Sequence, residues 1–185
     1  VARYGAGFVE AHRAVGLLTT LKHFPGHGSS TADSHEGFVD ITDSWQASEL
    51  EPYRTLMAQG LADMVMVGHL YHADYSDAGA QTPSSLSPQW IEGVLREELN
   101  YDGVIISDDL EMGAIRQHFT LEETVTKAVR AGMDVLLFSN TADYRESLGG
   151  EILEILVTEA EADAAFAARI EESYERIVAL KSRIQ

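Results

Sequence analysis

Cysteine is absent from the 185-residue chain, and only 4 of its residues are proline. Without cysteine the chain has no disulfide framework, no thiolate ligand for zinc and no thiol nucleophile, although the compartment stays open. Because 45% of the residues are hydrophobic, the chain has enough apolar side chain for a sizeable core. We therefore expect one folded domain over residues 1–185.

Positive charge is scarce as well, with 13 lysines and arginines against 30 aspartates and glutamates and a net charge of −17. Such a field repels phosphate polymers and anionic lipids, so we expect no nucleic-acid partner and no membrane partner. No stretch approaches the roughly 20 apolar residues that cross a bilayer, and the first seven residues lack a signal core. We expect a cytoplasmic location, with secretion as the alternative.

Four short apolar runs are predicted as strands, and each is followed by a loop and a helical pattern. They lie at residues 17–23, 63–68, 103–107 and 133–139. This alternation indicates an α/β fold with a parallel sheet. Four such units form half of an eight-unit barrel or most of a small doubly wound sheet, and periodicity does not choose between them.

Capping signals mark several predicted helix ends. Residues 160–185 repeat apolar side chains at helical spacing and are predicted as one outer helix. The predicted starts and stops are Ser48 with Glu51 as a capping box, Gly60 as a stop, Ser87 before Pro88 as an N-cap, Thr120 with Glu123 as a second capping box, and Gly132 as a stop.

Residues that could carry chemistry follow the strands. Asp33 and His35 lie two residues apart in the loop after the first strand, so they can form a hydrogen bond that favours a charged, proton-donating imidazole. Asp108 ends the third strand beside a second carboxylate and is a candidate nucleophile or charge stabiliser. Its ordinary alternative is a helix N-cap. The tips of the first and third strands are roughly 10 Å apart, which a long loop could bridge.

The histidines also allow other roles, which the sequence supports less well. A loop-built metal site would use His23, His27, His35 and Asp108. Pro25 and Gly26 separate His23 from His27 and prevent the helix that would place both on one face. We expect three further histidines to be ordinary surface residues, namely His12, His72 and His118.

Three segments together resemble a known family. Residues 22–28 read Lys-His-Phe-Pro-Gly-His-Gly, residues 33–35 read Asp-Ser-His, and residues 102–115 read Asp-Gly-Val-Ile-Ile-Ser-Asp-Asp-Leu-Glu-Met-Gly-Ala-Ile. This signature is similar to that of family 3 glycoside hydrolases, in the β-N-acetylhexosaminidase branch. The resemblance runs from about Gly7 to Asn140 and implies a (β/α)8 TIM barrel, of which this chain holds about the C-terminal half.

The resemblance also implies an activity and a set of site residues. The expected reaction is removal of a terminal β-linked N-acetylglucosamine, with retention of configuration, through a covalent glycosyl-enzyme intermediate. Asp108 matches the nucleophile, His35 the acid/base and Asp33 its partner, while Lys22 and His23 match residues that bind sugar hydroxyls. We add a further substrate-binding candidate, His69, at the end of the second strand. No metal and no organic cofactor are implied.

The chain departs from the family pattern at two points. The loop after His35 runs Glu36-Gly37-Phe38-Val39 in place of a Leu-Pro turn, and the first half of the barrel with its sugar-binding residues is missing. Half a barrel has two open sheet edges, so we expect self-association or association with the missing half. The alternatives to an enzyme of N-acetylglucosamine glycans are a non-catalytic carbohydrate-binding or assembly module and, third, a metal-dependent hydrolase.

Overall fold

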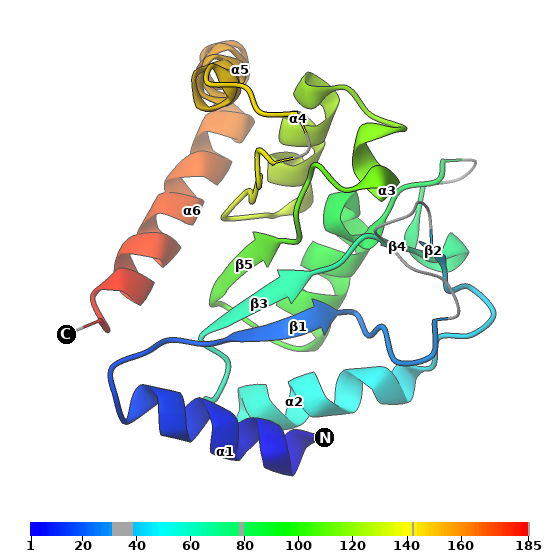
Figure 1. Cartoon of the computed structure of the whole chain (residues 1–185), viewed down its shortest axis with the longest axis vertical. Coiled ribbons are helices and arrows are strands. Elements are labelled where there is room, and N and C mark those ends of the chain that lie inside the picture. Colours follow the sequence, from blue (N-terminus) through cyan, green and yellow to red (C-terminus); the bar gives the residue numbers. More distant parts are fainter. Residues whose placement is uncertain (31–38, 78–79, 142, 185) are drawn as a thin grey trace.

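The main sheet of the computed structural model has three parallel strands in the order β1-β3-β5 (Figure 1). A second, two-stranded parallel sheet pairs β2 with β4. The structure describes residues 1–30, 39–77, 80–141 and 143–184. The strands are β1 (Thr20–Phe24), β2 (Val39–Asp40), β3 (Met64–Val67), β4 (Leu70–Tyr71) and β5 (Val104–Ser107).

Helices connect these strands, as the alternating pattern predicts. In Figure 1, α1 and α2 lie below β1, α4 to α6 lie beyond β5, and all three main arrows point toward β2 and β4. The α-helices are α1 (Ala2–Arg13), α2 (Glu51–Ala58), α3 (Gly113–Arg116), α4 (Leu121–Ala131), α5 (Leu148–Ala162) and α6 (Ala164–Lys181). The other helices are the 3-10 turns η1 (Ala47–Leu50), η2 (Ala73–Tyr75) and η3 (Ser84–Leu86) and the π-helix η4 (Gln89–Glu98).

The fourth predicted strand, residues 133–139, is only partly formed. Val135 makes a single parallel bridge to Ile106, and the Ser107 amide donates to the Val135 carbonyl at 3.0 Å. At the next position the Leu137 amide donates to the Oγ of Ser107, at 2.9 Å, and not to a backbone carbonyl. A side chain thus replaces the backbone partner, and the prediction of a full strand here is wrong.

The predicted start and end of α4 are confirmed. Thr120 and Glu123 form the predicted capping box of α4, and Gly132 closes that helix in the left-handed region with φ of 109°. The box predicted at Ser48 is wrong, because Ser48 lies inside η1 and α2 begins at Glu51.

The carboxyl-terminal helix prediction also needs correction, since two helices occupy this region. Asp163 separates α5 from α6 with an extended backbone, and its carboxylate accepts a hydrogen bond from the Ala165 amide at 2.9 Å. Aspartate at an N-cap stabilises the start of a helix, so this one residue ends the continuous pattern.

The largest core cluster lies between the sheet and its helices and is centred on Trp90, which is fully buried. Tyr75 stacks on Trp90 with ring centroids 3.7 Å apart, and Trp45 packs edge-on against it. His72, expected at the surface, is buried beside these rings and accepts a hydrogen bond from the Asp74 amide. Within the described residues, no helix combines the length and apolar character that spanning a membrane would need.

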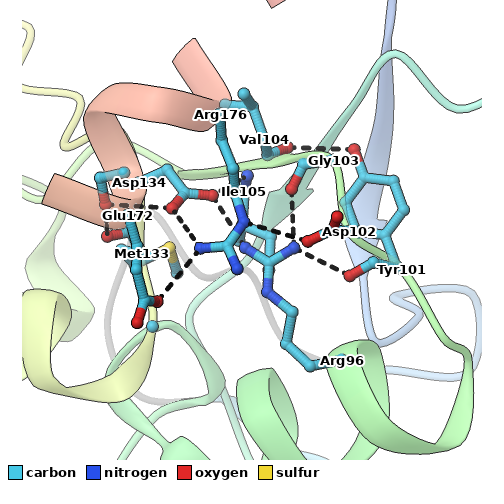
Figure 2. A network of polar contacts seen from close by, with 12 residues as sticks. Arg96, Tyr101, Asp102, Gly103, Val104, Ile105, Met133, Asp134, Glu172 and Arg176 are labelled. Carbon is cyan, nitrogen blue, oxygen red and sulfur yellow. Dashed lines mark hydrogen bonds and ion pairs between the residues drawn. The ribbon is translucent and has the colours of Figure 1, made fainter. Parts of the chain in front are cut away.

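A buried carboxylate, Asp134, holds the amino-terminal end of the sheet together (Figure 2). Its side chain is fully buried and accepts from the Ile105 amide at 2.9 Å. Arg96 of η4 and Arg169 of α6 reach it at 2.8 and 2.7 Å, and Arg176 reaches it at 3.5 Å. Because burying one charge without partners is costly, the guanidinium groups of η4 and α6 and the Ile105 amide of β5 are all held at this one carboxylate.

Asp63, at the start of β3, forms a second anchor of this kind. It accepts hydrogen bonds from Arg13 at the end of α1, from the amide and hydroxyl of Thr19, and from Arg183 after α6. Burial works to raise the pKa of Asp63, but these hydrogen bonds hold it below its ordinary value. Arg169, Arg176 and Arg183 are seven residues apart, so they form one row that joins the last helix to both buried carboxylates.

Candidate active site

The carboxyl ends of β1, β3 and β5 meet at one edge of the sheet, and two residues predicted for the site lie there side by side. His23 is the fourth residue of β1, and Asp108 directly follows β5. The Nε2 atom of His23 lies 3.6 Å from Oδ2 of Asp108, and their side chains are 30% and 21% exposed. Both groups are therefore partly open to solvent.

Gly68 makes this approach possible. β1 and β5 are not neighbours, since β3 lies between them, and Gly68 directly follows β3. A Cβ atom on Gly68 would lie 3.3 Å from the Cβ of His23, closer than ordinary contact. Because glycine has no side chain, the end of β3 leaves room for His23 to lean toward Asp108.

The two consecutive aspartates have different surroundings. Asp108 continues the sheet, since its amide donates to the Val67 carbonyl at 2.9 Å. The carboxylate of Asp109 instead accepts from the amides of Glu111 and Ser139, at 3.1 and 3.0 Å. Asp109 thus ties together the loops that follow β5 and residue 138, whereas Asp108 is the carboxylate beside His23.

His69 lies beneath this site. It is 1% exposed, its Nδ1 lies 2.7 Å from the Ser85 hydroxyl and its Nε2 lies 2.9 Å from the Asp109 carbonyl. Since a carbonyl only accepts, Nε2 is the protonated nitrogen and Ser85 donates to Nδ1. Burial lowers the pKa of His69, which keeps the ring neutral. With both nitrogens engaged, His69 supports the Asp108–Asp109 loop, and the geometry does not favour direct sugar contact.

The loop after β1 borders a cavity of about 600 Å³ along the outer side of that strand. Lys22 is exposed, and His27 forms a short contact through Nδ1 with the Ser30 hydroxyl. Lys22, His23 and His27 all line the cavity, together with Glu49 from η1. Sequence reasoning had not singled out Glu49.

Two of the predicted catalytic residues, Asp33 and His35, lie outside the described residues. The metal alternative also included His35. Among the residues that the structure describes, no three histidine or acidic side chains converge in a way that could hold a metal ion.

Several residues that shape the site were missed from sequence. Ser85 and Glu111 act through contacts with residues 16 and 29 positions away, with His69 and Asn140 respectively. No local pattern points to such pairs. Gly68 was visible as the glycine directly before His69, but its role depends on the lean of His23.

Comparison with known proteins gives close matches in sequence and structure. A beta-hexosaminidase of Stenotrophomonas maltophilia (strain R551-3) is 38% identical over 151 residues, covering 80% of this chain and 44% of the relative. A family 3 beta-N-acetylglucosaminidase from Paenibacillus sp. superposes with a TM-score of 0.87 at 35% identity, over 98% of this chain and 34% of that one. The beta-N-acetylhexosaminidase from Beutenbergia cavernae superposes with a TM-score of 0.84 at 27% identity, over 98% of this chain and 52% of that one.

The chain thus spans less than half the length of the curated relatives it matches. The agreement in fold confirms the predicted class, with the parallel strands and their helices forming part of a (β/α)8 barrel. The family model described as "Glycosyl hydrolase family 3 N terminal domain" matches residues 1–180. Since this match covers nearly every residue, the chain belongs to glycosyl hydrolase family 3.

Proposed function

We propose that this chain provides the nucleophile and the acid/base group of a retaining exo-β-N-acetylhexosaminidase. Its substrates would be glycans that end in β-linked N-acetylglucosamine, such as fragments of peptidoglycan or chitin. The observation that carries the proposal is the contact between His23 and Asp108 at the carboxyl ends of the strands. The names of the matched relatives, beta-hexosaminidase and beta-N-acetylglucosaminidase, support the substrate class.

The proposed reaction has two displacements. Asp108 attacks the anomeric carbon while the bond to the leaving oxygen breaks, and His35 gives its proton to that oxygen. The neutral His35 then takes a proton from water as the water oxygen displaces Asp108 from the sugar. Asp33 stabilises the imidazolium form of His35 in the first step. No cofactor is required, because the nucleophile and the proton donor are both side chains.

One feature of the described residues suits this chemistry. The Oδ1 atom of Asp108 accepts from the Asp109 amide at 2.9 Å, which helps to fix the carboxylate with Oδ2 toward His23. A histidine acid also avoids the repulsion that two adjacent carboxylates would suffer. His23 and Lys22 would then hold sugar hydroxyls next to the nucleophile.

We further propose that the isolated chain associates with a second copy or with the rest of a barrel. Within the described residues β1 pairs with β3 alone, and Val135 bridges β5 on one side only. Large apolar side chains are exposed on the outer helices and their connections, namely Tyr4, Phe8, Val15, Leu17, Leu153, Val157, Tyr174 and Val178. Covering open strands and apolar surface favours association.

Two measurements on the same sample test the proposed activity and the proposed association. Hydrolysis of nitrophenyl N-acetylglucosaminide by the 185-residue chain is measured beside its mass by light scattering, with Asp108→Asn as the inactive control. Turnover that disappears in Asp108→Asn, from a species larger than the 20.3 kDa monomer, is the expected result. Sugar binding without turnover would favour the non-catalytic binding module. An active monomer would contradict the association.

A further inference from the structure

The turn at residues 25–28, directly after β1, is held from outside by two side chains of the segment that leads into α2. Trp45 donates from Nε1 to the Pro25 carbonyl at 3.1 Å. Glu49 accepts from the Gly28 amide through Oε2, also at 3.1 Å. This turn is also bonded to His23, because the Gly26 amide donates to the His23 carbonyl at 2.9 Å. A short chain of contacts therefore runs from Glu49 to His23.

Glu49 packs directly onto the backbone of this turn. A Cβ atom on Gly26 would lie 2.6 Å from the Oε2 of Glu49 and 2.7 Å from its Cβ. Gly26 also has φ of +126°, in the region that side chains rarely adopt. Only glycine satisfies both conditions, so the turn and the carboxylate fit each other closely.

The hydrogen bond to Gly28 uses only one of the two carboxylate oxygens of Glu49. Within the described part of the chain, Oε1 of Glu49 is buried and accepts no hydrogen bond. Its charge also acts on a neighbouring side chain. Burial raises the pKa of Tyr53, and the nearby charge of Glu49 raises it further. An unpaired buried oxygen lowers stability, so stability alone does not explain a polar side chain here; what the side chain provides is the bond to the Gly28 amide.

We propose that Glu49 is a positioning residue for sugar binding. By holding the Gly28 amide, its carboxylate fixes the turn that follows Lys22 and His23, and so keeps His23 beside Asp108. The inference rests on the proposed function for the identity of the sugar. The opposing view is that Glu49 only braces the fold.

The test compares three variants of the 185-residue chain. Glu49→Ala removes the acceptor, Glu49→Gln keeps an oxygen acceptor without the charge, and Glu51→Gln is the matched control. Glu51 is 63% exposed at its side chain and contacts Arg54 at 3.5 Å. Affinity for N-acetylglucosamine, exchange of the Gly28 amide and the ring signals of His23 are all measured by NMR.

In Glu49→Ala we expect sugar affinity to fall about tenfold, as for loss of one hydrogen bond. Gly28 exchange should accelerate and the His23 ring signals should move. In Glu49→Gln the sugar affinity and the Gly28 exchange rate should return to within about threefold of the wild type, because an oxygen acceptor is kept. The His23 ring signals should return to their original positions. Glu51→Gln should match the wild type.

Two results would overturn the proposal. One is wild-type affinity in Glu49→Ala with a Gly28 amide that exchanges faster, which would make Glu49 a brace only. The other is Glu49→Gln binding as weakly as Glu49→Ala with Gly28 still protected, which would make charge the cause. If Glu49→Ala does not fold, Glu49→Asp, whose shorter side chain withdraws the acceptor, is judged by the same criteria.

Failure of the proposed function gives a different pattern. If the wild type does not bind N-acetylglucosamine, the sugar assignment fails, and positioning is judged on Gly28 exchange and the His23 signals alone. Changes in Glu49→Ala that Glu49→Gln reverses support the positioning role. Unchanged His23 signals contradict it.

Discussion

His23 and Asp108 come within 3.6 Å of each other although their strands are separated by β3. The missing side chain at Gly68 leaves His23 room to do this, because a Cβ atom there would lie 3.3 Å from the Cβ of His23. We therefore predict that Gly68→Ala displaces His23 from Asp108 and weakens N-acetylglucosamine binding severalfold, measured by NMR titration. Gly93→Ala is the control, because a Cβ atom there meets nothing within 4 Å. Equal binding by the two variants would show that the contact does not matter.

Asp108, and not Asp109, should be the nucleophile. Asp108→Ala should abolish covalent labelling by a fluorinated glycoside, detected as a mass increase, in the longest functional form of the protein. Asp109→Asn should keep the labelling but lower the melting temperature, because the Glu111 and Ser139 amides lose a charged acceptor. Labelling that survives in Asp108→Ala and disappears in Asp109→Asn would reverse the assignment.

Asp33 and His35 should act as one unit. Replacing either by alanine should reduce kcat/KM by a similar factor, because paired catalytic groups are not additive. The reduction should be smaller for a glycoside with a good leaving group, which needs less protonation. Steady-state kinetics with activated and unactivated glycosides measure this. Equal losses for both would show that His35 is not the acid.

Asp134→Asn should lower the free energy of unfolding by about 3 kcal/mol, since the partly buried arginines around it lose their counter-charge. Urea unfolding followed by circular dichroism measures the change. Asp102→Asn is the matched control, because Asp102 also contacts Arg176 but its side chain is 94% exposed. An exposed pair of this kind contributes about 1 kcal/mol at most. Similar losses in the two variants would contradict the anchoring role of Asp134.

His69 should make stability depend on pH. Burial lowers its pKa in the folded state, while the unfolded side chain titrates at about 6.5. Between these two values the unfolded state binds more protons, so stability should decrease as pH falls below about 6.5. Urea unfolding from pH 7.5 to 5 should show a shallower slope in His69→Gln than in the wild type.

The parts of the fold that were predicted from sequence depend on neighbouring residues. The capping box of Thr120 and Glu123 needs only a four-residue segment, and the left-handed stop at Gly132 needs one residue. The strand cores at β3 and β5 follow from short apolar runs. The split at Asp163 was missed because the apolar spacing continues through it, although aspartate is a strong N-cap.

The parts that were missed depend on distant residues. Asp63 was taken only as the first residue of a strand, yet its partners lie 44 to 120 positions away. His69 was taken as a ligand-binding group, but the hydroxyl and carbonyl that occupy its two nitrogens come from Ser85 and Asp109. At the candidate site, the resemblance gave His23 and Asp108 separate roles, but their contact was not predicted, because periodicity says nothing about how a side chain leans over β3.

The row formed by Arg169, Arg176 and Arg183 makes helix length matter more than helix composition. Seven residues are almost two full turns, so Arg169 and Arg176 differ by only about 20° around α6, and Arg183 lies just past the end of that helix. An inserted or deleted residue between two of them would rotate the later one by about 100°, away from its carboxylate. Length changes within residues 169–183 would therefore separate the two anchors at Asp134 and Asp63.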